Sequence, residues 1–107
     1  MRTPVDPQSV LRAGFAADVD GARWRYEGAL TFANASRVFA AALAMPLPSA
    51  GEVDLSGAVA VDSAAVAVLL ALRRRAADEG KPLSFTHVPA ALSALADLYS
   101  VEDLLAA

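Results

Sequence analysis

The sequence predicts an α/β fold, a mixed β-sheet packed with about three helices, in which an antiparallel N-terminal hairpin is followed by parallel strands. Two observations carry this prediction. Residues 8–30 contain an Asp-Gly turn signal between two strand-like stretches, as in a hairpin. After the hairpin, helical stretches alternate with short strand-like stretches, and strand–helix–strand units favour parallel neighbours.

The predicted hairpin occupies residues 8–30. Its first strand lies in the mostly apolar stretch 10–17, and its turn lies in 18–21. In the second strand the side chains alternate strictly, with Trp24, Tyr26 and Gly28 on one face and charged residues at 23, 25 and 27 on the other. Such alternation is typical of a strand with one buried face and one solvated face.

The first predicted helix spans residues 32–45. Thr31 precedes it and is a residue type that accepts backbone N–H bonds at a helix start. A stripe with helical spacing predicts the buried face, and it consists of Phe32, Ala35, Phe39 and Leu43. The proline- and glycine-containing segment 46–51 ends the helix.

A second strand–helix unit follows. A short strand is predicted over 52–55, then a connection over 56–62 that contains Gly57, and then a helix over 63–79. Asp62 and Ser63 are both good N-cap types, and Gly80 can adopt the left-handed conformation that ends a helix. The boundaries of this helix are therefore well marked.

The last elements are a strand over 83–86 and a helix over 90–99 that begins after Pro89. One face of this helix is apolar and consists of Leu92, Leu95 and Tyr99, with Leu98 on its flank. The tail, 101–107, is expected to pack through Leu104 and Leu105. Without repeats or linkers, the chain is expected to form a single domain over 1–107, with an irregular segment at 1–8.

Composition excludes several classes of function. The 107 residues contain no cysteine, and the formal net charge is −3. Cysteine-based zinc sites, thiolate catalysis and a broad nucleic-acid-binding surface are therefore not expected. The longest uninterrupted apolar run, 64–72, is far shorter than the about 20 residues of a membrane span, and the N-terminus lacks the pattern of a secretory signal. A cytoplasmic protein without metal or cofactor is expected.

The residues needed for catalysis are also scarce. His87 is the only histidine, and no second histidine or cysteine can accompany it in a metal site or a catalytic pair. Five acidic residues, at positions 78, 79, 97, 102 and 103, lie near helix ends, where solvated side chains are expected. The sequence therefore predicts that the protein is not an enzyme.

The Asp62-Ser63 pair has two interpretations. As an N-cap, either residue would stabilise the helix by about 1 kcal/mol, which is a sufficient reason for these residue types. The free N–H groups and the positive dipole end of a helix start also accommodate a phosphate or a carboxylate of a partner. Phosphorylation of Ser63 would add nearly two negative charges there, so that Ser63 could act as a switch.

The 63–79 helix carries a second apolar stripe. Its core face is predicted to consist of Ala65, Val68, Leu69, Leu72 and Ala76. About 100 degrees around the cylinder, Val66 and Leu70 form another stripe that Arg73 and Ala77 extend. This stripe indicates either a deeply buried helix or a docking patch. The arginines at 73–75 either complement the helix dipole or reach a partner.

Four segments resemble the STAS family, whose members include anti-anti-sigma factors, cytoplasmic domains of sulfate transporters and a lipid-transporter subunit, MlaB. They are VDLSG at 53–57, VDSAAVAVLL at 61–70, GKPLSFTHVP at 80–89 and LADLYSVEDLLA at 95–106. The last of these is especially similar to MlaB-type subunits. The resemblance covers about residues 24–105.

The resemblance implies a non-catalytic cytoplasmic subunit that binds and regulates or stabilises the ATPase (MlaF-like) of an Mla-type phospholipid transporter. That complex contains a permease, so the chain would be peripheral to the inner membrane. The implied interface begins at Ser63, with Asp62, Ala64 and Val66, and the second stripe adds Leu70 and Arg73.

An alternative remains open, because in anti-anti-sigma relatives the position of Ser63 is the phosphoacceptor. Ala65 stands here where those relatives usually have glycine, which departs from the pattern of kinase-switched members. The alternative function is an anti-anti-sigma factor switched by phosphorylation of Ser63.

Overall fold

The computed structural model describes residues 13–98, which form a four-stranded sheet with the strand order β1-β2-β3-β4. The strands are β1 (Gly14–Ala17), β2 (Arg23–Leu30), β3 (Glu52–Val61) and β4 (Ser84–Thr86). β1 pairs antiparallel with β2, whereas β2–β3 and β3–β4 pair in parallel. The predicted mixed sheet is confirmed.

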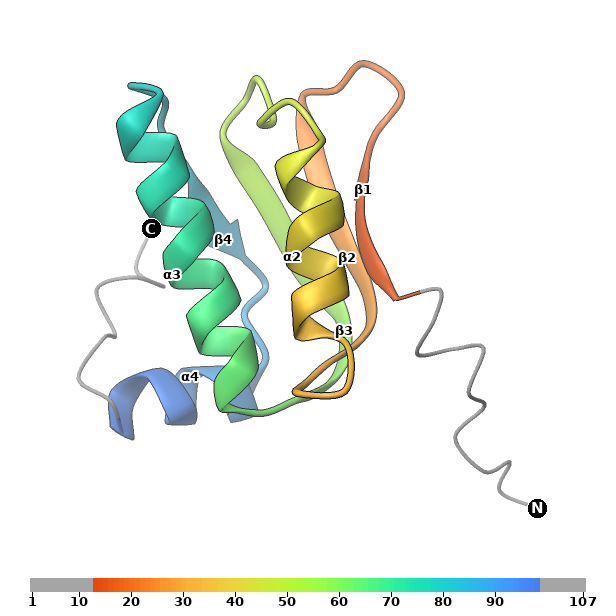
Figure 1. The fold of residues 1–107 in the computed structure, drawn as a ribbon, viewed down its shortest axis with the longest axis vertical. Helices are drawn as coiled ribbons and strands as arrows, with labels where there is room; N and C mark the ends of the chain where they lie inside the picture. Colours follow the sequence, from red (N-terminus) through yellow and green to blue (C-terminus); the bar gives the residue numbers. More distant parts are fainter. Residues whose placement is uncertain (1–12, 99–107) are drawn as a thin grey trace.

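Three helices accompany the sheet, and they are α2 (Ala35–Leu43), α3 (Ser63–Asp78) and α4 (Ala90–Leu98). α2 and α3 lie next to each other in front of the same face of the sheet, and α4 lies near the start of α3 (Figure 1). The predicted segment 1–8, the start of the first strand, Tyr99 and the tail 101–107 lie outside the described residues.

The core lies between the sheet and α2 and α3. The alternation predicted for β2 is confirmed, because Trp24 and Tyr26 are buried while Arg23, Arg25 and Glu27 are exposed. The predicted core face of α3 is also confirmed, since all five of its residues are buried. Burying such apolar side chains stabilises the fold by roughly 25 cal/mol for each Å² removed from water.

The first helix differs from the prediction. α2 begins at Ala35, because residues 32–34 form a turn in which the Thr31 carbonyl accepts from the N–H groups of Asn34 and Ala35. The later start is accompanied by a different buried face, which contains Val38 and Ala42. Phe32 is therefore 77% exposed, and the predicted stripe is wrong at both of its ends, Phe32 and Leu43.

β3 is longer than the predicted strand 52–55. It continues to Val61 with two register shifts against β2, so that it contains extra residues relative to its neighbour, as β-bulges do. A bulge adds twist and re-aims the residues that follow. Here the residues that follow are Asp62 and the start of α3.

Tyr26 is expected to make the fold less stable at alkaline pH. Its hydroxyl donates to the Ala29 carbonyl at 2.5 Å, and burial raises the pKa of the phenol from 10.0 to about 12. The unfolded chain therefore loses this proton first as pH rises. The stabilisation from the neutral phenol is complete below pH 10 and is lost, on the order of 2 kcal/mol, as pH rises toward about 12.

The pH effect is measured by urea unfolding at pH 9 and pH 11. The wild-type free energy of unfolding is expected to fall between these values more steeply than that of Tyr26→Phe, which has no proton to lose at this position. Equal slopes for the two proteins would show that Tyr26 is not the responsible group.

Candidate partner-docking site

An apolar hollow lies between α2 and α3 on the side of these helices that faces away from the sheet. Its volume is about 350 Å³. It is lined by Phe32, Ala35, Ser36 and Phe39 from the α2 side and by Ala64, Ala67, Val68 and Ala71 from α3. The hollow exists because most of these residues are small and leave the space between the two cylinders unfilled.

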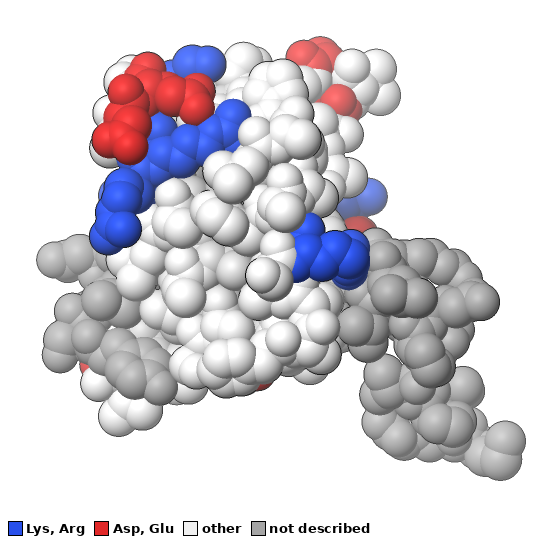
Figure 2. All heavy atoms as spheres, viewed as in Figure 1, with Lys and Arg blue, Asp and Glu red and all other residues white. Residues whose placement is uncertain are grey.

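The surface around the hollow carries little charge. Figure 2 shows this face of the molecule: most of its charged side chains gather at the end where α3 finishes, and a further basic group lies to the right of the centre. At the opposite end, Phe32 exposes 77% of its surface beside the hollow. An exposed aromatic side chain next to an apolar depression is typical of a protein-interaction surface.

Asp62 and Ser63 lie at the same end of the hollow as Phe32. Asp62 is the N-cap of α3, and its Oδ1 accepts from the Ala64 N–H at 2.8 Å. Its Oδ2 accepts from the Phe32 N–H at 3.0 Å. The predicted capping role is confirmed for Asp62. Ser63 is the first residue of α3 and is half-buried, so it is not sealed beneath the sheet.

Of the other predicted interface residues, one lines the hollow, one is buried in the core and two lie outside the hollow. Ala64 lines the hollow, although only 8% of it is exposed. Val66 is 4% exposed and belongs to the same buried cluster as Leu92 of α4, so it offers no surface to a partner. Of the two interpretations of the second stripe, deep burial holds at Val66, so Val66 is not part of a docking patch. Leu70 and Arg73 are half-buried and do not line the hollow.

Arg75 explains part of the basic run in α3. Its guanidinium donates to the carbonyls of Ala42 at 3.0 Å and Met45 at 2.7 Å, and it pairs with Glu79 at 2.8 Å. The charge therefore stabilises the C-terminal end of α2, where free carbonyls and the negative end of the helix dipole favour a cation. The sequence interpretation concerned the dipole of the helix that carries the arginines, whereas Arg75 binds carbonyls at the end of the neighbouring helix α2.

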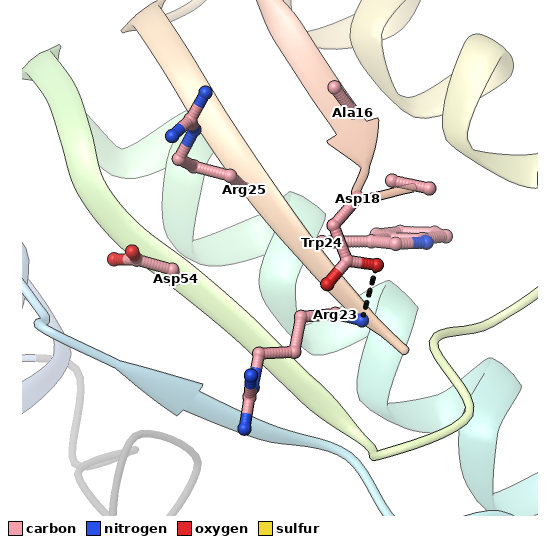
Figure 3. A pocket seen from close by; sticks show the side chains of 7 residues that line it. Ala16, Asp18, Arg23, Trp24, Arg25 and Asp54 are labelled. Atoms are coloured by element: carbon pink, nitrogen blue, oxygen red, sulfur yellow. Dashed lines mark hydrogen bonds between the residues drawn. The ribbon is translucent and has the colours of Figure 1, made fainter. Parts of the chain in front are cut away.

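The opposite face of the sheet contains a second hollow of about 250 Å³, which is lined mainly by residues of β1, β2 and β3 (Figure 3). Its charged groups have partners within the protein. Arg23 pairs with Glu52, and Arg25 pairs with Glu27 at 3.1 Å. This surface is a network of satisfied ion pairs on a solvated sheet face.

His87 lies near the edge of this second surface. Its Nδ1 is 3.1 Å from Oδ1 of Asp54, and its side chain is 70% exposed. The pKa of Asp54 is lowered, chiefly by the N–H of Ser56 and to a smaller extent by His87. Within residues 13–98, no three histidine, cysteine or acidic side chains are grouped as a metal site would require. None of the helices in that range is long and apolar enough to cross a membrane.

Sequence reasoning did not find most of the residues that line the α2–α3 hollow. The available signal was the spacing of Ala64, Ala67 and Ala71, which places three small side chains on one helix face. That face was not distinguished because alanine is common throughout the chain.

Comparison with known proteins agrees with this architecture. The family model described as "Mlab, STAS domain" matches residues 14–106, a range that contains all four strands and the three described helices. No curated protein matches the sequence. Because the family model covers most of the chain, the chain belongs to the STAS family, as a domain of the MlaB-like kind.

Proposed function

We propose that the chain is a non-catalytic accessory subunit that binds the ATPase subunit of an Mla-type phospholipid-transport ABC system. The docking surface is the α2–α3 hollow with its flanking Phe32. Family membership supports the class of partner. The observation that carries the proposal is an open hollow without charged lining residues, which lies beside the half-buried start of α3.

The shape of the hollow favours an apolar group of the partner. Burying Phe32 and the alanine-lined floor removes apolar surface from water, and each Å² contributes roughly 25 cal/mol before the costs of association. Regulation follows if the chain binds one conformation of the ATPase more tightly than another, because a ligand shifts an equilibrium only by its difference in affinity.

Three of the predicted interface residues belong to this surface or to its edge. Asp62 and Ser63 lie at one end of the hollow, and Ala64 is part of its lining. Leu70 and Arg73 lie around the helix from the hollow and are not assigned to the docking surface. Through this contact the chain would be held in a complex with the ATPase and the permease at the inner membrane.

The proposal is tested by purifying the tagged protein, expressed at its native level, under gentle conditions and identifying the associated proteins by mass spectrometry. We expect an ABC ATPase together with an integral permease. The ATPase activity of the purified complex is then compared with and without the chain. A kinase-type anti-sigma protein, together with phosphate on Ser63, would overturn the proposal in favour of the anti-anti-sigma function.

A further inference from the structure

We propose that Asp62 is a positioning residue that sets the open end of the docking hollow by tying the starts of α2 and α3 together. This inference rests on the proposed function. The two oxygens of one carboxylate are used on different elements. Oδ1 accepts from Ala64 in α3, at 2.8 Å, whereas Oδ2 accepts from Phe32 in the turn before α2, at 3.0 Å.

The turn that contains Phe32 has further hydrogen bonds of its own, so the hydrogen bond between Asp62 and Phe32 affects more than one residue. The Asn34 side chain accepts from the Thr31 N–H at 3.1 Å and donates to the Ala29 carbonyl at 2.8 Å. The Thr31 carbonyl also accepts from the Ala35 N–H at 2.8 Å, at the start of α2. Fixing the Phe32 amide therefore fixes the end of β2 and the start of α2 relative to α3.

At the other end of the two helices, Arg75 of α3 donates hydrogen bonds to the carbonyls of Ala42 and Met45, at the end of α2. Between these two ends, half of the residues that line the hollow are alanines, which do not fill the gap. Besides the packing of both helices on the sheet, hydrogen bonds at both ends of the hollow fix the separation of the helices.

The consequence for binding is preorganisation. Phe32 is 77% exposed, and its backbone N–H is held by Oδ2 of Asp62. A partner that docks on an already fixed Phe32 loses less conformational entropy than one that must order it. Asp62 thus contributes to affinity through Phe32, without needing to contact the partner.

The substitution Asp62→Asn is expected to remove the hydrogen bond to the Phe32 N–H while keeping the N-cap hydrogen bond to the Ala64 N–H. Asparagine has one acceptor oxygen instead of two, and it is as good an N-cap as aspartate. We expect the Ala64 amide to keep its hydrogen bond and the Phe32 amide to lose its own. Hydrogen exchange of the Phe32 amide, followed by NMR, should become roughly five- to tenfold faster, while exchange at Ala64 is unchanged. Affinity for the purified ATPase should fall by about threefold or more.

Thr31→Ala is the matched control. It removes a local hydrogen bond in the same turn, from the Ala33 N–H to the Thr31 hydroxyl at 3.3 Å, but it leaves both oxygens of Asp62 in use. Its affinity for the ATPase is expected to stay close to that of the wild type. An equal loss of affinity in Thr31→Ala and Asp62→Asn would show that general loosening of the turn, and not the tie, matters.

Two results would overturn the inference directly. One is unchanged exchange at Phe32 in Asp62→Asn, and the other is faster exchange with unchanged affinity. If the wild-type chain does not bind the ATPase, the proposed function fails separately. Nuclear Overhauser effects between the Phe32 ring and the methyl groups of Ala64 and Ala67, which line the same hollow, are expected in the wild type and then decide the positioning role. Asp62→Asn should weaken these contacts, and their persistence would contradict it.

Discussion

Replacing Ala67 by arginine is expected to abolish measurable binding to the ATPase, a loss of roughly a hundredfold or more. Ala67 lines the hollow and is exposed, so the substitution places a long charged side chain in the docking surface without disturbing the core. An arginine there would fill the space meant for the partner and would be desolvated without a counter-charge on docking. Isothermal titration calorimetry with the purified ATPase measures the change.

Ala77→Arg is the control for this variant. Ala77 is also an exposed alanine of α3, it does not line the hollow, and it lies about 15 Å further along the helix. It belongs to the second stripe that the sequence indicated. We expect wild-type affinity for Ala77→Arg, with an unfolding midpoint in urea close to that of Ala67→Arg. Loss of binding in Ala77→Arg alone would place the interface on that stripe.

Replacing Gly57 by alanine is expected to destabilise the domain by about 3 kcal/mol or more, or to prevent folding. A Cβ atom at this position would be 2.3 Å from the backbone carbonyl oxygen of Tyr26 and 2.6 Å from a carboxylate oxygen of Glu27. The Glu27 side chain can move, but the Tyr26 carbonyl belongs to β2 and can move only with the sheet. Strain of this kind is among the few mechanisms that give large effects from a single substitution.

The cost at Gly57 is measured by urea unfolding, with Gly14→Ala as the comparison. A Cβ atom at Gly14, in β1, would meet no atom within 4 Å, so this glycine-to-alanine change is expected to shift stability by less than about 1 kcal/mol. If Gly57→Ala were as stable as Gly14→Ala, β2 and β3 would have to be further apart than the structure places them.

The fold was largely predictable because its signals are local. The alternation in β2 and the caps of α3 each depend on a few adjacent residues. Asp62 caps α3, and Gly80 has the expected left-handed backbone with φ of +66°. The start of α2 was mispredicted because Thr31, a good N-cap type, opens a turn there, and the helix begins four residues after it.

The docking site was less predictable because it depends on relations between distant residues. The second oxygen of Asp62 accepts from Phe32, which is 30 positions away, and Arg75 binds carbonyls that are 30 and 33 positions away. A residue-type pattern cannot show such pairs. Val66 was misassigned for a related reason, because its burial follows from the placement of a separate helix, α4, that helical periodicity within α3 does not report.

The central claim, that the partner covers the α2–α3 hollow, is tested most directly by thiol protection. The chain contains no cysteine, so Ser36→Cys places a single thiol in the hollow and Ala77→Cys places one on α3 outside it. Maleimide labelling of each variant is followed by mass spectrometry with and without saturating ATPase. We expect labelling at position 36 to slow by at least about tenfold in the complex while labelling at position 77 is unchanged. Protection at 77 with free labelling at 36 would contradict the account.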